Sequence, residues 1–85
     1  MKLYRYKGRC NVSGVNIKVL RIAAGLSQEQ LAARLQTKGL QITQKQISRI
    51  ETGERVLADF ELMIFARVLG TSADGLLSEC RPRRV

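Results

Sequence analysis

Residues 27–51 constrain the fold most, because they carry the same helix-start signal twice. Ser27 lies three residues before Gln30, and Thr43 lies three residues before Gln46. In each pair the hydroxyl and the side-chain amide can hydrogen-bond the backbone N–H groups that are left free at the start of a helix. Losing one such cap typically costs ~1 kcal/mol. The repetition therefore predicts two short helices joined by a turn.

Both predicted helices carry an apolar stripe. Leu31, Ala32 and Leu35 lie on one face of the first helix, and Ile47 and Ile50 lie on one face of the second. Apolar residues at this spacing indicate a helix that packs one side against a core. We therefore expect the opposite face of each helix to be exposed to solvent.

The outer face of the second helix has groups suited to reading base pairs. It offers amide, ammonium, hydroxyl and guanidinium groups and no acid. Gln can bond adenine at two points, and Arg or Lys can bond guanine in the same way. A short polar face can also be simply solvated, but two capped helices in succession favour a helix-turn-helix whose second helix enters the major groove. The face consists of Gln44, Lys45, Ser48 and Arg49.

Between residues 17 and 77, five short motifs follow one another. None of them is diagnostic alone, but their order and spacing together are a strong signal. They are Ile17-x-x-Leu20-Arg21, Gly25-Leu26-Ser27-Gln28-x-x-Leu31-Ala32, Ile47-Ser48-Arg49-Ile50-Glu51-x-Gly53, Ala66-x-x-Leu69-Gly70 and Ser72-x-Asp74-x-Leu76-Leu77.

These motifs resemble the phage-repressor and Cro-like helix-turn-helix family, often called XRE-like. The resemblance implies an all-α fold, a five-helix lambda-repressor-like domain. The chain departs from the family at residues 36–41, where relatives usually have a single residue, commonly Gly. We expect either an enlarged turn between helices two and three or an extra turn of helix two that ends at Gly39. Leu40 and Ile42 would anchor this segment on the core.

The resemblance also implies which side chains contact DNA. Glu54, in the loop after helix three, would point away from phosphate or pair with Arg55. The implied base contacts are Gln44, Lys45 and Arg49, and the implied backbone contacts are Gln28, Thr43, Ser48 and Arg55.

A further pair is implied by the family pattern. Arg21 in the first helix would form a partly buried ion pair with Glu51 at the end of the third. Such a pair would lock the recognition helix, residues 44–51, onto the first helix. The alternative is that the two residues are unrelated surface charges.

The flanking helices are predicted from apolar spacing. The first spans about residues 14–24, the fourth about 59–69, and Ser72 caps a short fifth helix. The residues expected to face the core are Val15, Ile17, Leu20 and Ala24 in the first helix and Phe60, Met63, Ile64, Phe65, Val68 and Leu69 in the fourth.

The formal net charge is +8, and the excess of bases lies at the two ends of the chain. Residues 1–12 carry four bases and no acid, and we interpret them as a basic arm or a short strand. Residues 13–78 form the predicted helix-turn-helix domain, and residues 79–85 a basic flexible tail. A strong positive charge favours a polyanionic partner, although basic ends can also serve solubility alone.

Several classes of protein are disfavoured. There is no His, and Cys10 and Cys80 are too far apart in sequence to form a metal motif. No nucleophile has a recognisable activating partner, so we expect no enzymatic activity, no metal and no cofactor. No apolar run approaches the roughly 18 residues of a membrane span, and no signal peptide is visible. We therefore expect a cytoplasmic protein without a membrane partner.

The leading hypothesis is a sequence-specific duplex DNA-binding regulator of transcription, a repressor, that acts as a homodimer. Leftover apolar surface around the fourth and fifth helices is the expected dimer face. The alternative is an antitoxin or adaptor on the same fold, whose partner is a protein such as a toxin or another regulator. RNA binding is a third reading, but the aromatic platforms of RNA-binding modules are missing.

Overall fold

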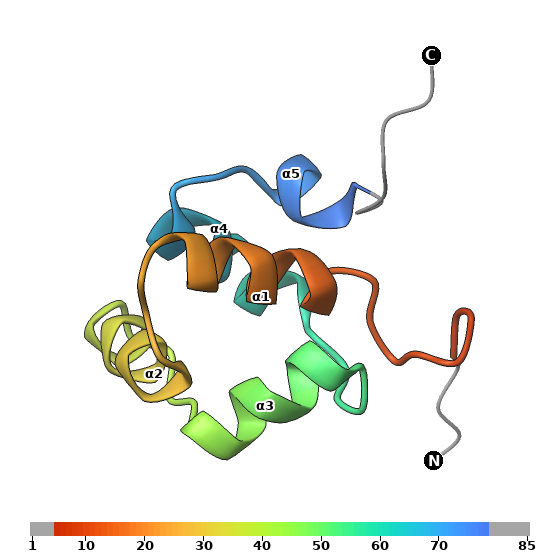
Figure 1. Ribbon diagram of the computed structural model, residues 1–85, viewed down its shortest axis with the longest axis horizontal. Coiled ribbons are helices and arrows are strands. Elements are labelled where there is room, and N and C mark those ends of the chain that lie inside the picture. Colours follow the sequence, from red (N-terminus) through yellow and green to blue (C-terminus); the bar gives the residue numbers. More distant parts are fainter. Residues whose placement is uncertain (1–4, 79–85) are drawn as a thin grey trace.

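The computed structural model describes residues 5–78, which form five helices. The first four residues of the predicted arm and the whole predicted tail, with Cys80, lie outside the described residues. Figure 1 shows α1 in the middle of the molecule, with α5 on one side of it and α3 on the other. The helices are α1 (Gly14–Ala23), α2 (Gln28–Thr37), α3 (Gln44–Thr52), α4 (Asp59–Leu69) and α5 (Ala73–Leu77).

The two central helices begin where their caps predict. Ser27 Oγ accepts from the Gln30 amide at 3.0 Å, and Gln30 Oε1 accepts in return from the Ser27 amide at 2.8 Å. The same box opens α3, where the two distances between Thr43 and Gln46 are 3.2 and 3.0 Å. Both capping boxes are therefore confirmed, and they fix the ends of α2 and α3 that face each other.

The turn between α2 and α3 is enlarged. α2 ends at Thr37, and Gly39 follows with a φ of +88°, a conformation that favours glycine. Leu40 and Ile42 then enter the core, as predicted. The carbonyl of Ile42 also accepts a hydrogen bond from the Gln36 side chain at 2.9 Å. The turn is thus anchored at its second half and exposed at its first half.

One apolar core lies between the helices. α1 contacts α3, α4 and α5, and α2 contacts α3 and α4. Each helix adds at least one buried apolar side chain to the same core. Packing of this kind supplies most of the stability of short helices. The fully buried large side chains of the core are Ile17, Leu31, Leu35, Ile42, Ile47, Ile50, Phe65 and Leu76.

The predicted inner face of α4 is wrong at two positions. Phe60 and Met63 are 57% and 48% exposed, whereas Phe65 is fully buried. The reason is Glu61, which takes the inward position in the first turn of α4 because its carboxylate binds the Ala58 amide at 3.0 Å and the Arg55 guanidinium. The buried face therefore runs from Glu61 through Phe65, and Phe60 and Met63 turn outward.

The predicted inner face of α1 is also partly wrong. Val15 and Ala24 are exposed, while Asn16 is buried beside Ile17. Asn16 faces inward because its side-chain amide donates to the Leu76 carbonyl of α5 at 2.9 Å. A polar residue thus takes a place that apolar spacing alone would give to Val15.

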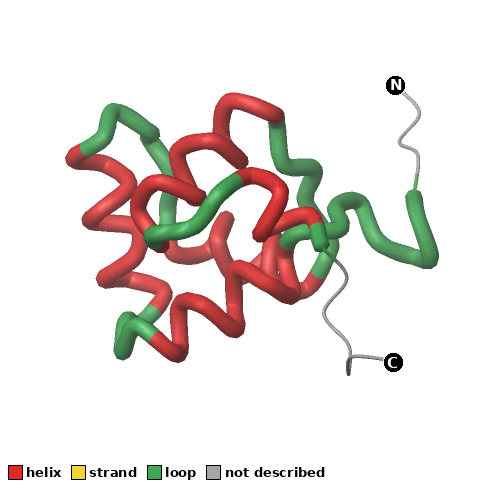
Figure 2. Tube along the Cα trace, turned by 90° about the horizontal axis from the view of Figure 1, so that it is seen from above, coloured by secondary structure: helices red, strands yellow, loops and turns green. Residues whose placement is uncertain are grey.

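The described part of the N-terminal segment contains a tight turn. Tyr6 and Arg9 form an isolated antiparallel bridge that closes a tight turn. Figure 2 shows this loop extending beyond the helical body. Within residues 5–78, no helix is long and apolar enough to cross a membrane.

Candidate nucleic-acid interface

The outer face of α3 is open to solvent. Gln44, Lys45 and Arg49 are exposed, and Ser48 is half-buried. Ile47, on the opposite side of the helix, is fully buried. The amide, ammonium and guanidinium groups therefore project from a helix whose other side is held in the core.

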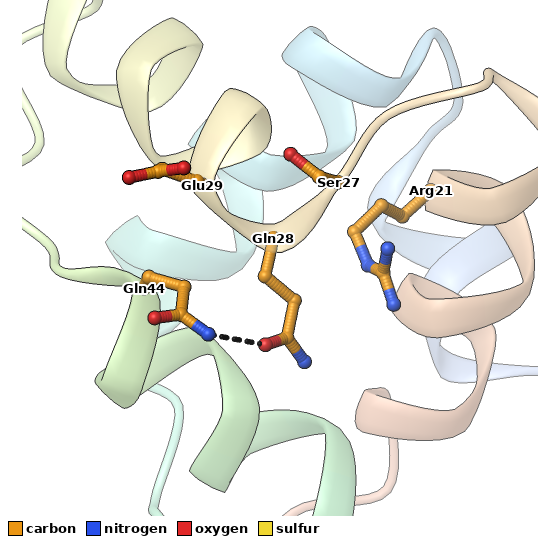
Figure 3. A pocket seen from close by; sticks show the side chains of 5 residues that line it. All are labelled: Arg21, Ser27, Gln28, Glu29 and Gln44. Carbon is orange, nitrogen blue, oxygen red and sulfur yellow. Dashed lines mark hydrogen bonds between the residues drawn. The ribbon is translucent and has the colours of Figure 1, made fainter.

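A chain of hydrogen bonds connects the start of α3 to α1. Gln44 Nε2 donates to Gln28 Oε1 at 2.9 Å, as Figure 3 shows. Gln28 Nε2 donates to Glu51 Oε1 at 3.0 Å, and Arg21 Nε donates to Glu51 Oε2 at 2.7 Å. Arg21 also donates to the carbonyl of Leu26 at 2.8 Å. These bonds tie both ends of α3 to the start of α2 and to the last turn of α1.

The chain of bonds has a fixed direction. A carboxylate can only accept hydrogen bonds, so the side chain of Gln28 must turn its NH₂ group toward Glu51 and its oxygen toward Gln44. Gln44 must then use one N–H to reach Gln28. Its second N–H and its oxygen remain available, and these are the two groups that a bidentate contact with adenine needs.

The pair of Arg21 and Glu51 is well shielded from water. Their side chains are 11% and 3% exposed, and a second contact joins Arg21 Nη2 to Glu51 Oε1 at 3.1 Å. Burying two charges carries a desolvation cost that can offset their attraction. Among the described residues, however, no buried side-chain nitrogen or oxygen lacks a partner. The pair thus fixes the position of α3 relative to α1.

The far end of α3 is held by a residue that the sequence analysis missed. Asn11 donates from Nδ2 to the carbonyls of Ile50 and Arg55, at 3.0 and 2.8 Å, and its Oδ1 accepts from the Gly14 amide at 2.8 Å. These bonds join the start of α1 to the end of α3 and to the loop that follows. No local pattern could reveal contacts between residues so distant in sequence.

Arg9 completes this attachment. Its Nη2 donates to the Glu51 carbonyl at 3.0 Å, and its Nε donates to the Asn11 carbonyl at 3.3 Å. A cation at a helix C-terminus is favourable because the helix dipole is negative there. Gly53 has a φ of +84°, and a Cβ at this position would lie 2.7 Å from Arg9 Cζ. The backbone conformation therefore favours glycine at position 53, and a larger residue there would also have to displace the Arg9 side chain.

Arg55 lies in the loop after α3 and pairs within the protein. Its Nη2 and Nη1 donate to the two carboxylate oxygens of Glu61 at 2.9 and 3.1 Å. Of the two alternatives expected for Glu54, pairing with Arg55 is not found, and Glu54 is exposed. Burial alone would raise the pKa of Glu61, but the hydrogen bonds from Arg55 and from the Ala58 amide outweigh it and lower the pKa below its usual 4.5.

An open hollow lies where the starts of α2 and α3 face each other, and its lining side chains are shown in Figure 3. The N-terminus of α2, with its free N–H groups, borders this hollow and suits a phosphate oxygen. In residues 5–78 no group of His, Cys, Asp and Glu side chains is arranged to hold a metal ion. The lining residues are Arg21, Ser27, Gln28, Glu29 and Gln44.

Five helices with a solvent-facing recognition helix define a helix-turn-helix domain. A family model described as helix-turn-helix, HTH_3, matches residues 17–76. The chain therefore belongs to this family of XRE-type, lambda-repressor and Cro-like domains. It is a family of DNA-binding regulators that are generally not enzymes. No curated protein matches the chain.

Proposed function

We propose that this protein is a sequence-specific regulator of transcription, a repressor, that binds duplex DNA with α3 in the major groove. The observation that supports this proposal most is the outward face of α3, where Gln44, Lys45 and Arg49 are exposed while the helix is held at both ends. A rigid helix presents these groups without paying much ordering entropy on binding. Repression follows if a bound protein blocks other proteins from the same stretch of DNA.

Each exposed side chain of α3 has a role in this proposal. Gln44 reads adenine with its free N–H and oxygen, and Arg49 reads guanine through its guanidinium. Lys45 bonds a second guanine or an adjacent acceptor. A well-placed bidentate contact discriminates against the wrong base by about 1–3 kcal/mol. The three side chains together would read part of one half-site.

A second set of residues would contact the phosphates. Such contacts fix the register of α3 on the DNA but do not themselves read sequence. Arg55 would contact a phosphate while it remains paired with Glu61. Its attraction for the phosphate is therefore weaker than that of an unpaired arginine. The proposed backbone contacts are Gln28, Thr43, Ser48 and Arg55.

We also propose that the protein binds as a homodimer through α4 and α5. Phe60 and Met63 lie one turn apart on α4 and are about half-exposed, as is Leu77 on α5. A contiguous apolar patch is typical of an interface, and we propose that these side chains contribute to one. Two copies related by a twofold axis would place their α3 helices about 34 Å apart, one turn of DNA.

The test is selection from a library of random duplexes with the purified protein. We expect one enriched half-site repeated as an inverted pair with centres about 10 base pairs apart. Enrichment of a single unrepeated half-site would contradict the dimer but not the sequence-specific binding. If no sequence is enriched at low ionic strength, the proposed function is wrong.

A second candidate function has one observation in its favour. Val15, Val19 and Ile22 form an apolar ridge along α1 in which each side chain is at least 40% exposed. This ridge would be covered by a protein partner if the domain served as an antitoxin or adaptor. A partner that co-purifies in fixed ratio, and that is lost in an Ile22→Asp variant with unchanged DNA binding, would support this second function.

A further inference from the structure

The tight turn at residues 5–9 lies outside the part of the chain that the family model matches, residues 17–76. The Tyr6 amide donates to the Arg9 carbonyl at 2.7 Å, and the Arg9 amide donates to the Tyr6 carbonyl at 3.0 Å. Lys7 and Gly8 have φ values of 52° and 80°. Positive φ at both central residues is the geometry of a type I′ hairpin turn. The described segment is therefore a defined turn with its own backbone bonds.

The turn is attached firmly to the recognition helix. Arg9 and Asn11 bond the carbonyls at the end of α3, and the Cys10 amide donates to the Gly53 carbonyl at 2.8 Å. In Figure 1 the turn lies beyond the C-terminal end of α3, whereas α2 lies beyond its other end. The attachment therefore fixes the turn next to the C-terminal end of α3.

The turn carries unneutralised positive charge. Arg5 and Lys7 are exposed, and neither takes part in the ion pairs found within residues 5–78. Arg5 Nη1 donates to the Gly8 carbonyl at 3.1 Å, and Lys7 Nζ lies 5.4 Å from the centroid of the Tyr6 ring. No acidic residue occurs between residues 5 and 9. Two cations thus project from a turn whose position relative to α3 is set.

We propose that this turn is a second phosphate-binding site, and that Arg5 and Lys7 bind the DNA backbone near the C-terminal end of α3. The proposal rests on the proposed function, since it requires α3 to lie in that groove. A helix in the major groove has a phosphate backbone on each side of it. With α3 in the groove, the N-terminus of α2 would contact one of these backbones and the turn would contact the other. The turn would therefore add affinity without changing which bases are read.

The test compares the full chain with an Arg5→Gln/Lys7→Gln variant on the duplex selected with the unaltered protein. The slope of log affinity against log salt concentration should become shallower by about 2, roughly one unit for each lost phosphate contact. Ethylation interference should lose its signal at phosphates on one edge of the half-site, and the selected sequence should stay the same.

The matched control removes two positive charges elsewhere. Lys18→Gln/Lys38→Gln changes exposed lysines on α1 and beyond the end of α2, so it lowers the net charge equally. We expect its interference pattern to match that of the unaltered protein, and thermal unfolding should show that both variants fold.

The outcomes separate the two proposals. If the unaltered protein selects a sequence but the turn variant keeps the same slope and interference pattern, or changes only as much as the control, the turn is merely solvated and this inference is wrong. If the unaltered protein selects no duplex, the proposed function fails, and the inference that rests on it fails as well.

Discussion

Gln44 and Gln28, the first residues of α3 and α2, are joined by a hydrogen bond of 2.9 Å between their side chains. Because Glu51 accepts from the other end of Gln28, the bond can run only from the Gln44 amide nitrogen to the Gln28 oxygen. The orientation of a side chain proposed to read DNA is therefore set by residues inside the protein.

Replacing Gln28 should disturb base reading from a distance. In Gln28→Ala, Gln44 loses its acceptor, so its amide can rotate. We therefore expect relaxed preference, by about 1 kcal/mol, at the base pair that Gln44 is proposed to contact. The measurement is a set of binding isotherms with all four base pairs at that position. The control is Gln41→Ala, which removes an exposed amide in the α2–α3 turn. If the two variants show the same base preferences, Gln28 does not control how Gln44 reads its base pair.

Arg49→Ala should relax specificity at one base pair. If Arg49 makes the proposed bidentate contact, its loss should lower discrimination by about 1–3 kcal/mol at that position and change little elsewhere. Arg34→Ala, which removes an exposed arginine on α2, serves as the control and should alter no position. If Arg49→Ala leaves the binding-site profile unchanged, Arg49 does not contact a base.

Breaking the pair of Arg21 and Glu51 should destabilise the fold. We expect Arg21→Ala to lower the free energy of unfolding by about 3 kcal/mol, since it leaves a buried carboxylate without its partner. Urea unfolding measures this loss. The double variant Arg21→Met/Glu51→Leu should recover much of it, because apolar residues leave no buried charge behind. A double variant no more stable than Arg21→Ala would contradict this expectation.

Asn11 should contribute to the stability of the fold although it lies in a loop. Asn11→Ala removes the two bonds to the carbonyls of Ile50 and Arg55, and we expect a loss of about 1–3 kcal/mol in the free energy of unfolding. Asn11→Asp keeps the size and the acceptor for Gly14 but cannot donate, so it should be destabilised as well. If Asn11→Asp unfolds like the unaltered protein, the carbonyl contacts contribute nothing.

Acid should weaken the fold partly through Glu61. Its pKa is lower in the folded protein than its usual 4.5, so the unfolded chain binds a proton more readily than the folded one. The resulting stabilisation is present above the unfolded pKa and is lost as the pH falls through the lower, folded value. Urea unfolding between pH 7 and pH 3 should show a smaller loss of stability for Glu61→Gln than for the unaltered protein. If the free energy of unfolding falls equally with pH in both proteins, the lowered pKa of Glu61 is contradicted.

Local sequence signals were enough to predict α2 and α3 and the apolar face that each of them turns to the core. The two capping boxes act within four residues, and the stripes of α2 and α3 follow helical spacing, so both are visible in the sequence itself. Gly53 was also predictable, because a residue with positive φ after a helix is usually glycine.

Contacts between distant polar groups could not be predicted in the same way. Asn11 and Asn16 are buried because their amides reach carbonyls of other helices, and nothing near them in sequence signals this. Glu61 displaced Phe60 and Met63 from the predicted core for a similar reason, through its pair with Arg55. Apolar spacing fails where a polar side chain finds a partner inside the fold.

In the anchored turn between α2 and α3, the length of the connection is independent of the orientation of α3. Ile42 is buried and Thr43 caps α3. The orientation of α3 therefore depends on the core and on its own cap. The preceding residues, 37–39, are exposed. Extra residues or a fluorescent label inserted there would lengthen the connection while leaving the orientation of the proposed DNA-reading surface intact.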